Sequence, residues 1–197
     1  NLGMGATQMT DIIESLHQDH VHMAQIAAIV ERELATIEDG RTADFEALED
    51  IMRYVTGYPD TYHHPTEDIV FGRLKLRMPE SIEEIDAILS EHRQVIEAGI
   101  RFLDAVRAVQ EDVVMIRNDF TLIGRDYLSL LARHMNIEEA RLFPLAKSTL
   151  TDEDWQELNE RIEQRPDPLF GASLDDDYRR LRCRIEAHRD EDRDSQA

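Results

Sequence analysis

Apolar residues recur at three- and four-residue steps along most of the chain, which is the spacing of one face of an α-helix. No stretch alternates strictly between apolar and polar residues, so nothing in the pattern indicates a β-sheet. With only 6 prolines and 8 glycines in 197 residues, few positions interrupt helices. We therefore predict an all-α protein. The predicted helices span residues 10–38, 44–77, 81–109, 113–145, 151–165 and 174–190.

Local signals predict where several of these helices begin and end. Thr10 or Asp11 is suited to cap the first helix, and Gly40 to end it with left-handed backbone. The sequence Ser81-Ile82-Glu83-Glu84 has the form of a capping box and predicts the start of the third helix. Pro65 lies within the second helix and predicts a kink or a short break beside it.

The first four helices are long enough to form one bundle, and the remainder forms an extension. We predict a helical bundle over residues 10–147 and a C-terminal helical extension over 148–197. Thr151 and the acids after it are suited to cap the first helix of the extension. The next helix has few apolar anchors, and residues 190–197 are predicted to be frayed or disordered.

Composition and charge narrow the class of protein. A net charge of −20 argues against a nucleic-acid partner, because such proteins need a basic face to displace counterions. No apolar run reaches membrane-spanning length, and residues 1–10 lack the features of a signal peptide. Cys183 is the single cysteine, as expected for a free thiol in a reducing compartment. We therefore predict a cytoplasmic protein without membrane or nucleic-acid partners.

A pattern of metal-ligand residues occurs twice in the chain. His20 is followed 43 residues later by His63, with Glu67 four residues beyond it. His92 is followed 42 residues later by His134, with Glu138 again four residues beyond it. The two sets are offset by 72 and 71 residues, and chance rarely produces such matched spacings and partners.

Helical hairpins would bring these residues together. The midpoint between His20 and His63 falls at the break after the first helix, and that between His92 and His134 falls near residue 113. In an antiparallel hairpin, residues equally far from the turn lie at one level, because each residue rises about 1.5 Å. The i,i+4 spacing places each carboxylate on the same helix face as its histidine. This predicts a two-metal centre of four imidazoles and two carboxylates, a ligand set suited to Fe, Mn or Zn.

Other polar residues near the pattern are weaker candidates for metal ligands. His64 matches no second-set residue, and we interpret it as either an additional ligand or a residue at the rim. His17 lies one helical turn before His20 and could replace it as a ligand or act as its outer partner, whereas His22 lies on another face of the helix. Asp68 and Glu139, which follow the two glutamates, are expected to be solvated surface acids. Asp19 and Glu91 precede His20 and His92, but an adjacent acid points to another face of the helix, so we give this match no mechanistic role.

These residues resemble the hemerythrin-like, or HHE cation-binding, family over about residues 10–147. The matching segments are Leu16–His20, Tyr62–Asp68, Glu91–His92 and His134–Pro144, and the segment Asp167–Gly171 is similar to a tail of bacterial members. The resemblance implies an up-down-up-down antiparallel four-helix bundle around a non-haem di-iron centre with an oxo, hydroxo or water bridge. It also implies specific roles: His20 and His63 on one iron, His92 and His134 on the other, and Glu67 and Glu138 bridging them.

One position departs from the oxygen-carrying members, and it shapes the expected function. Those proteins have a further histidine four residues after the third-helix ligand, where this chain has Ile96. The departure argues against reversible oxygen carriage and favours binding or sensing of oxygen, nitric oxide, peroxide or iron. The alternatives are an enzyme that decomposes peroxide or handles nitric oxide, with Tyr62 or Tyr127 as a proton donor, and iron storage or transient oxygen binding. A sensor would need a protein partner or a second copy, which we expect the C-terminal helices to contact.

Overall fold

A computed structural model describes residues 4–163, 165–171 and 178–194, with side chains from residue 12 to 187 within those ranges. Every regular element in the described residues is helical. The longer helices are α1 (Met4–Glu38), α2 (Phe45–Tyr58), α3 (His64–Arg77), α4 (Ile82–Gln110), α5 (Arg117–Ile137), α6 (Phe143–Thr149), α7 (Asp152–Arg161) and α8 (Arg179–Asp194). Shorter turns are η1 (Pro59–His63), η2 (Pro79–Ser81) and η3 (Glu138–Leu142).

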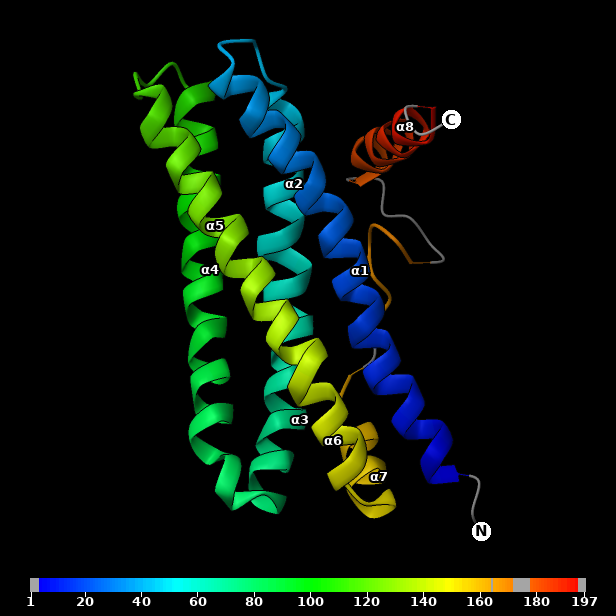
Figure 1. Cartoon of the computed structure of the whole chain (residues 1–197). Coiled ribbons are helices and arrows are strands. Elements are labelled where there is room, and N and C mark those ends of the chain that lie inside the picture. The colour runs from blue at the N-terminus through cyan, green and yellow to red at the C-terminus, as the bar shows by residue number, and fades with distance from the viewer. Residues whose placement is uncertain (1–3, 164, 172–177, 195–197) are drawn as a thin grey trace.

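The helices form an antiparallel up-down-up-down four-helix bundle, which confirms the predicted fold class. Its four columns are α1, α2 continued by α3, α4, and α5 continued by α6 (Figure 1). In the core, α1 packs against α5 and α2 packs against α4, so each of the two sequential hairpins lies against the other. Short connections between antiparallel neighbours are typical of this architecture.

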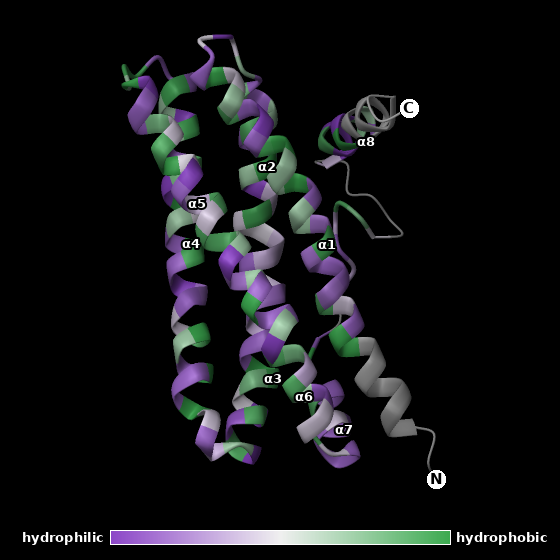
Figure 2. Ribbon diagram, in the orientation of Figure 1, coloured by the Kyte–Doolittle hydropathy of each residue, from purple (hydrophilic) through white to green (hydrophobic). Residues whose placement is uncertain are grey.

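The bundle has two apolar clusters rather than one continuous core. Hydrophobic and hydrophilic residues are mixed around each helix, as expected for one buried face (Figure 2). The first cluster includes Leu34, Leu48 and Phe102, and the second includes Leu16, Phe71 and Leu142. Along α1 the two clusters lie on either side of His20, which is itself 4% exposed. A polar layer is therefore buried between two apolar ones.

Several predicted helix ends are corrected by the structure. The first helix begins at Met4 rather than at Thr10 or Asp11, and it ends as expected before Gly40, whose φ is +77°. Ser81 makes no side-chain capping bond, because a 3-10 turn leads into α4 instead. The fourth column starts at Arg117 rather than at residue 113, and Val114, which lies within the predicted helix 113–145, is 98% exposed in the preceding loop.

Two π-helical turns interrupt the columns that carry the predicted histidine and glutamate pairs. The break expected beside Pro65 lies at η1, where the backbone N–H of His64 donates to the carbonyl of Pro59. The turn at η3, where the N–H of Phe143 donates to the carbonyl of Glu138, was not predicted. Such turns insert one residue into a helix and re-aim the side chains around it.

The C-terminal extension contributes to both apolar clusters. Thr151 and Asp154 form the expected capping box of α7, and Trp155 of that helix is 1% exposed in the second cluster. Leu181 and Ile185 of α8 are buried in the first cluster. The helix α8 continues to Asp194, beyond the predicted limit, while residues 172–177 and 195–197 lie outside the described residues.

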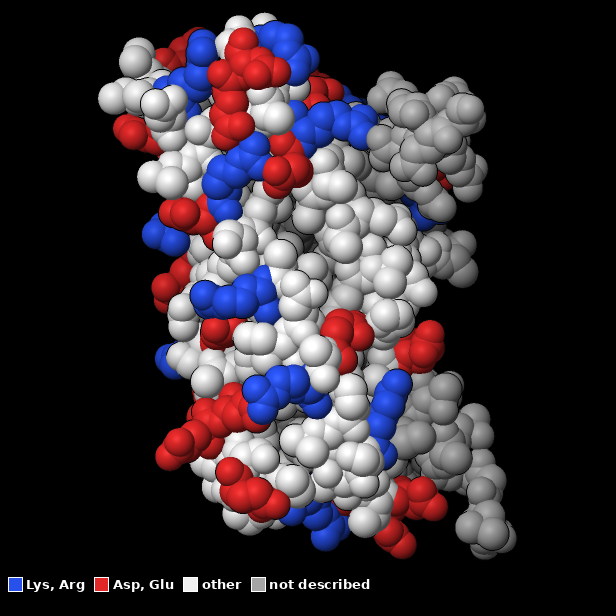
Figure 3. Space-filling model, viewed as in Figure 1, with Lys and Arg blue, Asp and Glu red and all other residues white. Residues whose placement is uncertain are grey.

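The surface carries both signs of charge despite the acidic composition. On the face seen in Figure 3, acidic and basic side chains are interspersed, and no basic field gathers there. No helix in the described part of the chain is both long and apolar enough to cross a membrane. Cys183 is exposed and unbridged.

Candidate metal centre

The six predicted ligand residues meet in the polar layer at the middle of the bundle. The hairpin of α1 with α2, η1 and α3 contributes three of them, and the hairpin of α4 with α5 and η3 contributes the other three. None of the six is more than 4% exposed. They are His20, His63, Glu67, His92, His134 and Glu138.

The carboxylate of Glu67 lies between the two histidine pairs. Its Oε1 is 3.3 Å from Nε2 of His63 and 3.5 Å from Nε2 of His20. Its Oε2 is 3.4 Å from Nε2 of His92, on the other hairpin. Each oxygen of one carboxylate therefore faces nitrogen donors of a different pair.

The carboxylate of Glu138 occupies the corresponding position on the other side. Its Oε1 is 3.2 Å from Nε2 of His92, and its Oε2 is 3.3 Å from Nε2 of His134 and 3.5 Å from Nε2 of His20. Donor atoms of Glu67, His92, His134 and Glu138 lie within 4.8 Å of one another, as do those of His20, His63 and Glu67. Two overlapping donor groups thus share Glu67.

The hydrogen bonding of the layer fits a metal site. Buried polar atoms in folded proteins nearly always have partners. Here several buried donor atoms of the layer have none, and all of them point inward. They are Nε2 of His20, His63 and His134, both oxygens of Glu67 and Oε2 of Glu138. Imidazole and carboxylate donors with no thiolate suit Fe, Mn or Zn.

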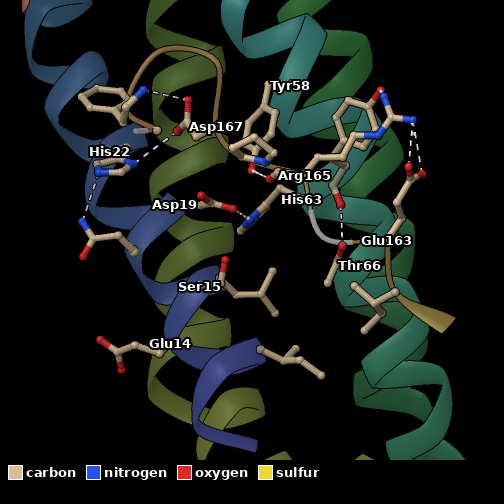
Figure 4. Close-up of a pocket in the computed structure, with 18 residues that line it drawn as sticks. Glu14, Ser15, Asp19, His22, Tyr58, His63, Thr66, Glu163, Arg165 and Asp167 are labelled. Atoms are coloured by element: carbon tan, nitrogen blue, oxygen red, sulfur yellow. Dashed lines mark hydrogen bonds and ion pairs between the residues drawn. The ribbon is translucent and has the colours of Figure 1, made fainter. Parts of the chain in front are cut away.

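Three further acids accept hydrogen bonds from the outer nitrogens of three histidines, and a fourth acid faces the outer nitrogen of His134. Nδ1 of His63 donates to Asp19 at 3.1 Å, as the dashed line in Figure 4 shows, and Nδ1 of His134 lies 3.7 Å from Glu91. Between the hairpins, Nδ1 of His20 donates to Glu139 at 2.8 Å, and Nδ1 of His92 donates to Asp68 at 2.6 Å. Such bonds fix the tautomer and orientation of a metal-binding imidazole, leaving Nε2 for the cation.

These outer acids correct two expectations from the sequence. Asp68 and Glu139 were expected to be solvated, and Asp68 is indeed 52% exposed, yet each holds a histidine of the opposite hairpin. Asp19 and Glu91 do not face their neighbours His20 and His92, but they do face the histidines across their own hairpins. The signal was present in the sequence, because all four acids obey the same offset of 71 or 72 residues.

The buried charges strongly perturb the pKa of the histidines. Burial alone would lower the pKa of His63, but Glu67 and Asp19 outweigh it and raise the pKa to about 10. Burial is likewise outweighed at His92, where Asp68, Glu138 and Glu67 raise the pKa to about 11. The pKa of His134 is lowered to about 3 by burial, which outweighs the opposing effect of Glu67 and is reinforced by His92. The pKa values of these histidines therefore differ strongly from that of a histidine in water.

The two glutamates have pKa values displaced in opposite directions. Burial would raise the pKa of Glu67, but the nearby His63, His20 and His92 hold it well below its ordinary value. Burial and the negative charge of Glu67 raise the pKa of Glu138 to about 7. Two carboxylates this close cannot both ionise cheaply unless positive charge lies between them.

A second polar group lies outside the layer, in a pocket of about 680 Å³ between α1 and the segment after α7 (Figure 4). Asp167 caps its own loop, accepting from the backbone of Leu169 and Phe170 and from the hydroxyl of Tyr54 at 2.8 Å. His22 is 3.3 Å from Asp167 and stacks on the ring of Phe170, so it faces away from the layer as predicted.

The remaining residues considered from the sequence have distinct positions. His17 contacts Glu139 at 2.9 Å, so it supports the acid that holds His20. The hydroxyl of Tyr62 accepts from Arg165, whereas the buried hydroxyl of Tyr127 has no partner. His64 is 2% exposed and lies within the layer, with its ring against His92.

Comparison with known proteins agrees with this geometry. The sequence model of one family, described as Hemerythrin HHE cation binding domain, matches residues 11–146, which span the four columns of the bundle. No curated protein and no solved structure matches the chain.

Proposed function

Because the chain belongs to the hemerythrin HHE cation-binding domain family, we propose that it is a non-haem di-iron protein that binds or senses a small ligand. The ligand class is oxygen, nitric oxide or peroxide, with iron availability as the further signal. The buried histidine and glutamate cluster fits a metal site whichever metal is native.

One observation supports two cations rather than one. Each glutamate presents its two oxygens to nitrogen donors from both hairpins, which is the arrangement that a pair of bridged cations requires. In this proposal His20 and His63 hold one cation and His92 and His134 hold the other. Glu67 and Glu138 would bridge them, with an oxo, hydroxo or water group between the two cations.

Iron is preferred to manganese or zinc because the proposed function needs a metal that binds diatomic ligands. When bound, iron would supply reversible redox chemistry and affinity for such ligands. The chain itself orients three of the imidazoles through hydrogen bonds to Asp19, Asp68 and Glu139, while Glu91 faces the fourth at 3.7 Å. The two apolar clusters on either side of the layer limit the access of water to it.

Ile96 favours an incomplete coordination shell on the cation that His92 and His134 would hold. Ile96 lies one helical turn after His92 and lines a pocket with it, but its side chain has no donor atom. Two imidazoles and two bridging carboxylates leave room for an exogenous ligand on a six-coordinate iron. This is the feature that favours ligand binding over a closed structural site.

The test loads the protein anaerobically with Fe(II) and then adds oxygen, peroxide or nitric oxide while the absorption spectrum is recorded. We expect two irons per chain and a spectral change on ligand addition without sustained consumption of ligand. Sustained loss of peroxide or nitric oxide would instead favour the enzymatic alternative, and a stable reversible oxygen adduct would favour carriage.

A matched pair of variants separates the centre from adventitious binding. Glu67→Gln removes the shared bridge and should reduce iron to one per chain or less. Glu14→Gln changes an exposed acid outside the layer and should retain two. Wild-type protein that never exceeds one tightly bound metal per chain would reject the proposal.

A further inference from the structure

His64 breaks the two-fold repeat of the polar layer. The offset of 71 residues that relates His63 to His134 and Glu67 to Glu138 relates His64 to Met135. Met135 is a partly buried residue packed against the first apolar cluster. The two halves of the layer therefore differ at this pair, with an imidazole on one side and a thioether on the other.

The imidazole of His64 is buried without a hydrogen-bond partner. It is 2% exposed, and neither Nδ1 nor Nε2 makes a hydrogen bond. Asp60 lies 3.3 Å from Nδ1 but not in hydrogen-bonding geometry. Asp60 is therefore an ion-pair partner for Nδ1, whereas Nε2 has no hydrogen-bond or ion-pair partner among the described residues. Burying Nε2 unpaired costs free energy, so its position points to a partner that these residues do not supply.

The ring of His64 lies beside one half of the layer. It stacks on His92 with ring centroids 4.8 Å apart, and its centroid is 5.7 Å from that of His134. Its nitrogens nevertheless make no ion pair with Glu67 or Glu138, whereas Nε2 of His92 and of His134 lies within 3.4 Å of at least one of these carboxylates. His64 thus stands just outside the donor set.

A pocket of about 660 Å³ connects this half of the layer with the surface. His64 and His92 line it together with Ile96, and the exposed Asp68 and Arg93 lie at its rim. The pocket on the opposite side of the layer meets His63, but Nδ1 of that ring is already bonded to Asp19 (Figure 4). Of these two pockets, the one lined by His92 is therefore the one that leads a small molecule to the layer beside His64.

We propose that His64 receives the exogenous ligand: a small anion or diatomic molecule enters this pocket, binds the His92 and His134 cation, and accepts a hydrogen bond from His64. The inference rests on the proposed function, which supplies the cation. It assigns ligand binding to one of the two cations and gives His64 a positioning role rather than a place among the metal ligands. Ile96 is the residue whose lack of a donor atom leaves that coordination position available.

The experiment uses azide as the probe on the iron-loaded, oxidised full chain. Azide affinity is measured by absorption titration, and iron per chain is measured in the same samples. We expect His64→Leu to keep two irons and to weaken azide binding roughly 10- to 100-fold, as for loss of a hydrogen bond to a charged group. His64→Gln, which retains a donor, should keep most of the affinity, and Met135→Leu at the related position should leave it unchanged.

A second variant tests the route independently. Ile96→Phe narrows the pocket without changing any donor, so the association rate of azide should fall several-fold at unchanged iron content.

Three results would overturn the inference. If His64→Leu or His64→Gln lost one iron per chain, His64 would be a metal ligand and not a partner of the exogenous molecule. If both bound azide as the wild type does, the hydrogen bond would not exist. If the wild type took up no iron, the proposed function would fall with the inference, whereas the first two results leave the proposed function intact.

Discussion

His63 donates its Nδ1 hydrogen to Asp19, the residue directly before His20, at 3.1 Å. The acid next to one histidine thus orients the histidine across the hairpin. The equivalent pair, His134 with Glu91, lies 3.7 Å apart. Because Asp68 and Glu139 accept hydrogen bonds from histidines of the opposite hairpin, acids of both hairpins hold His63, His92 and His20.

The first prediction concerns this outer network. Asp19→Asn removes the charge that holds His63 and should weaken metal binding about 10- to 100-fold, the usual cost of losing such a partner. Glu91→Gln should cost less, because Glu91 lies further from its histidine. Chelator-competition titrations measure both affinities. Glu14→Gln, an exposed acid of the same pocket as Asp19, is the control, and equal losses in all three variants would show a general charge effect instead.

The second prediction separates stability from metal binding. Glu138 is fully buried, and its pKa of about 7 shows that ionising it beside Glu67 is costly without cations. In metal-free protein at pH 7, Glu138→Gln should therefore raise the free energy of unfolding by about 1–2 kcal/mol. With metal present the order should reverse, because the wild type gains more binding free energy than the variant. Urea unfolding with and without chelator measures this, and a variant less stable in both conditions would contradict it.

The third prediction tests packing between α1, α4 and α5. A Cβ at Gly124 would lie 2.8 Å from both methyl carbons of Leu34 and 3.0 Å from the ring of Phe102, both fully buried. Gly124→Ala should therefore destabilise the protein by about 1–3 kcal/mol, in spite of the better helix propensity of alanine. Gly72→Ala in α3 meets nothing within 4 Å and should stabilise it by up to about 1 kcal/mol. Thermal unfolding of the pair gives the two signs, and a shift of the same sign in both would refute the packing argument.

The fourth prediction concerns the attachment of the extension at acid pH. Burial would raise the pKa of Asp154, but bonds from Arg77, Thr151 and Arg73 lower it to about 2. A carboxylate with a lowered folded-state pKa stabilises the protein above its unfolded pKa near 4, and this stabilisation is lost as pH falls toward 2. Asp154→Asn should cost about 1–2 kcal/mol at pH 7 and progressively less below pH 4. Asp152→Asn, an exposed acid of the same turn, is the control for urea unfolding at each pH.

The fold could be predicted from sequence because its pattern is local. Apolar spacing and the break after residue 38 follow from helix periodicity and from Gly40, whose positive φ ends the turn. Equal distances from the two hairpin turns then place the histidines at one level. A break was predicted at residues 110–112, but the loop extends to residue 116. Its length was underestimated because Val114 and Ile116 have the spacing of an inward face, yet they precede the helix and are exposed.

The outer acids could not be predicted by considering one helix at a time. Asp68 is half exposed and follows a buried glutamate, so its own helix gives no reason to expect a bond to His92. That bond depends on how the hairpins pack against each other. The turn at Glu138–Leu142 was not predicted, although Pro144 stands two residues beyond it as Pro65 stands two residues beyond η1.

The repeated hairpin has an evolutionary consequence. A homodimer of a single such hairpin would place the same imidazoles, bridging carboxylates and supporting acids around an exact symmetry axis. Joining two copies in one gene releases each position from having to serve both sides, so that residues 64 and 135 are free to diverge. The two halves of the layer can then become different through substitutions beside the axis, while the four histidines and two glutamates stay fixed.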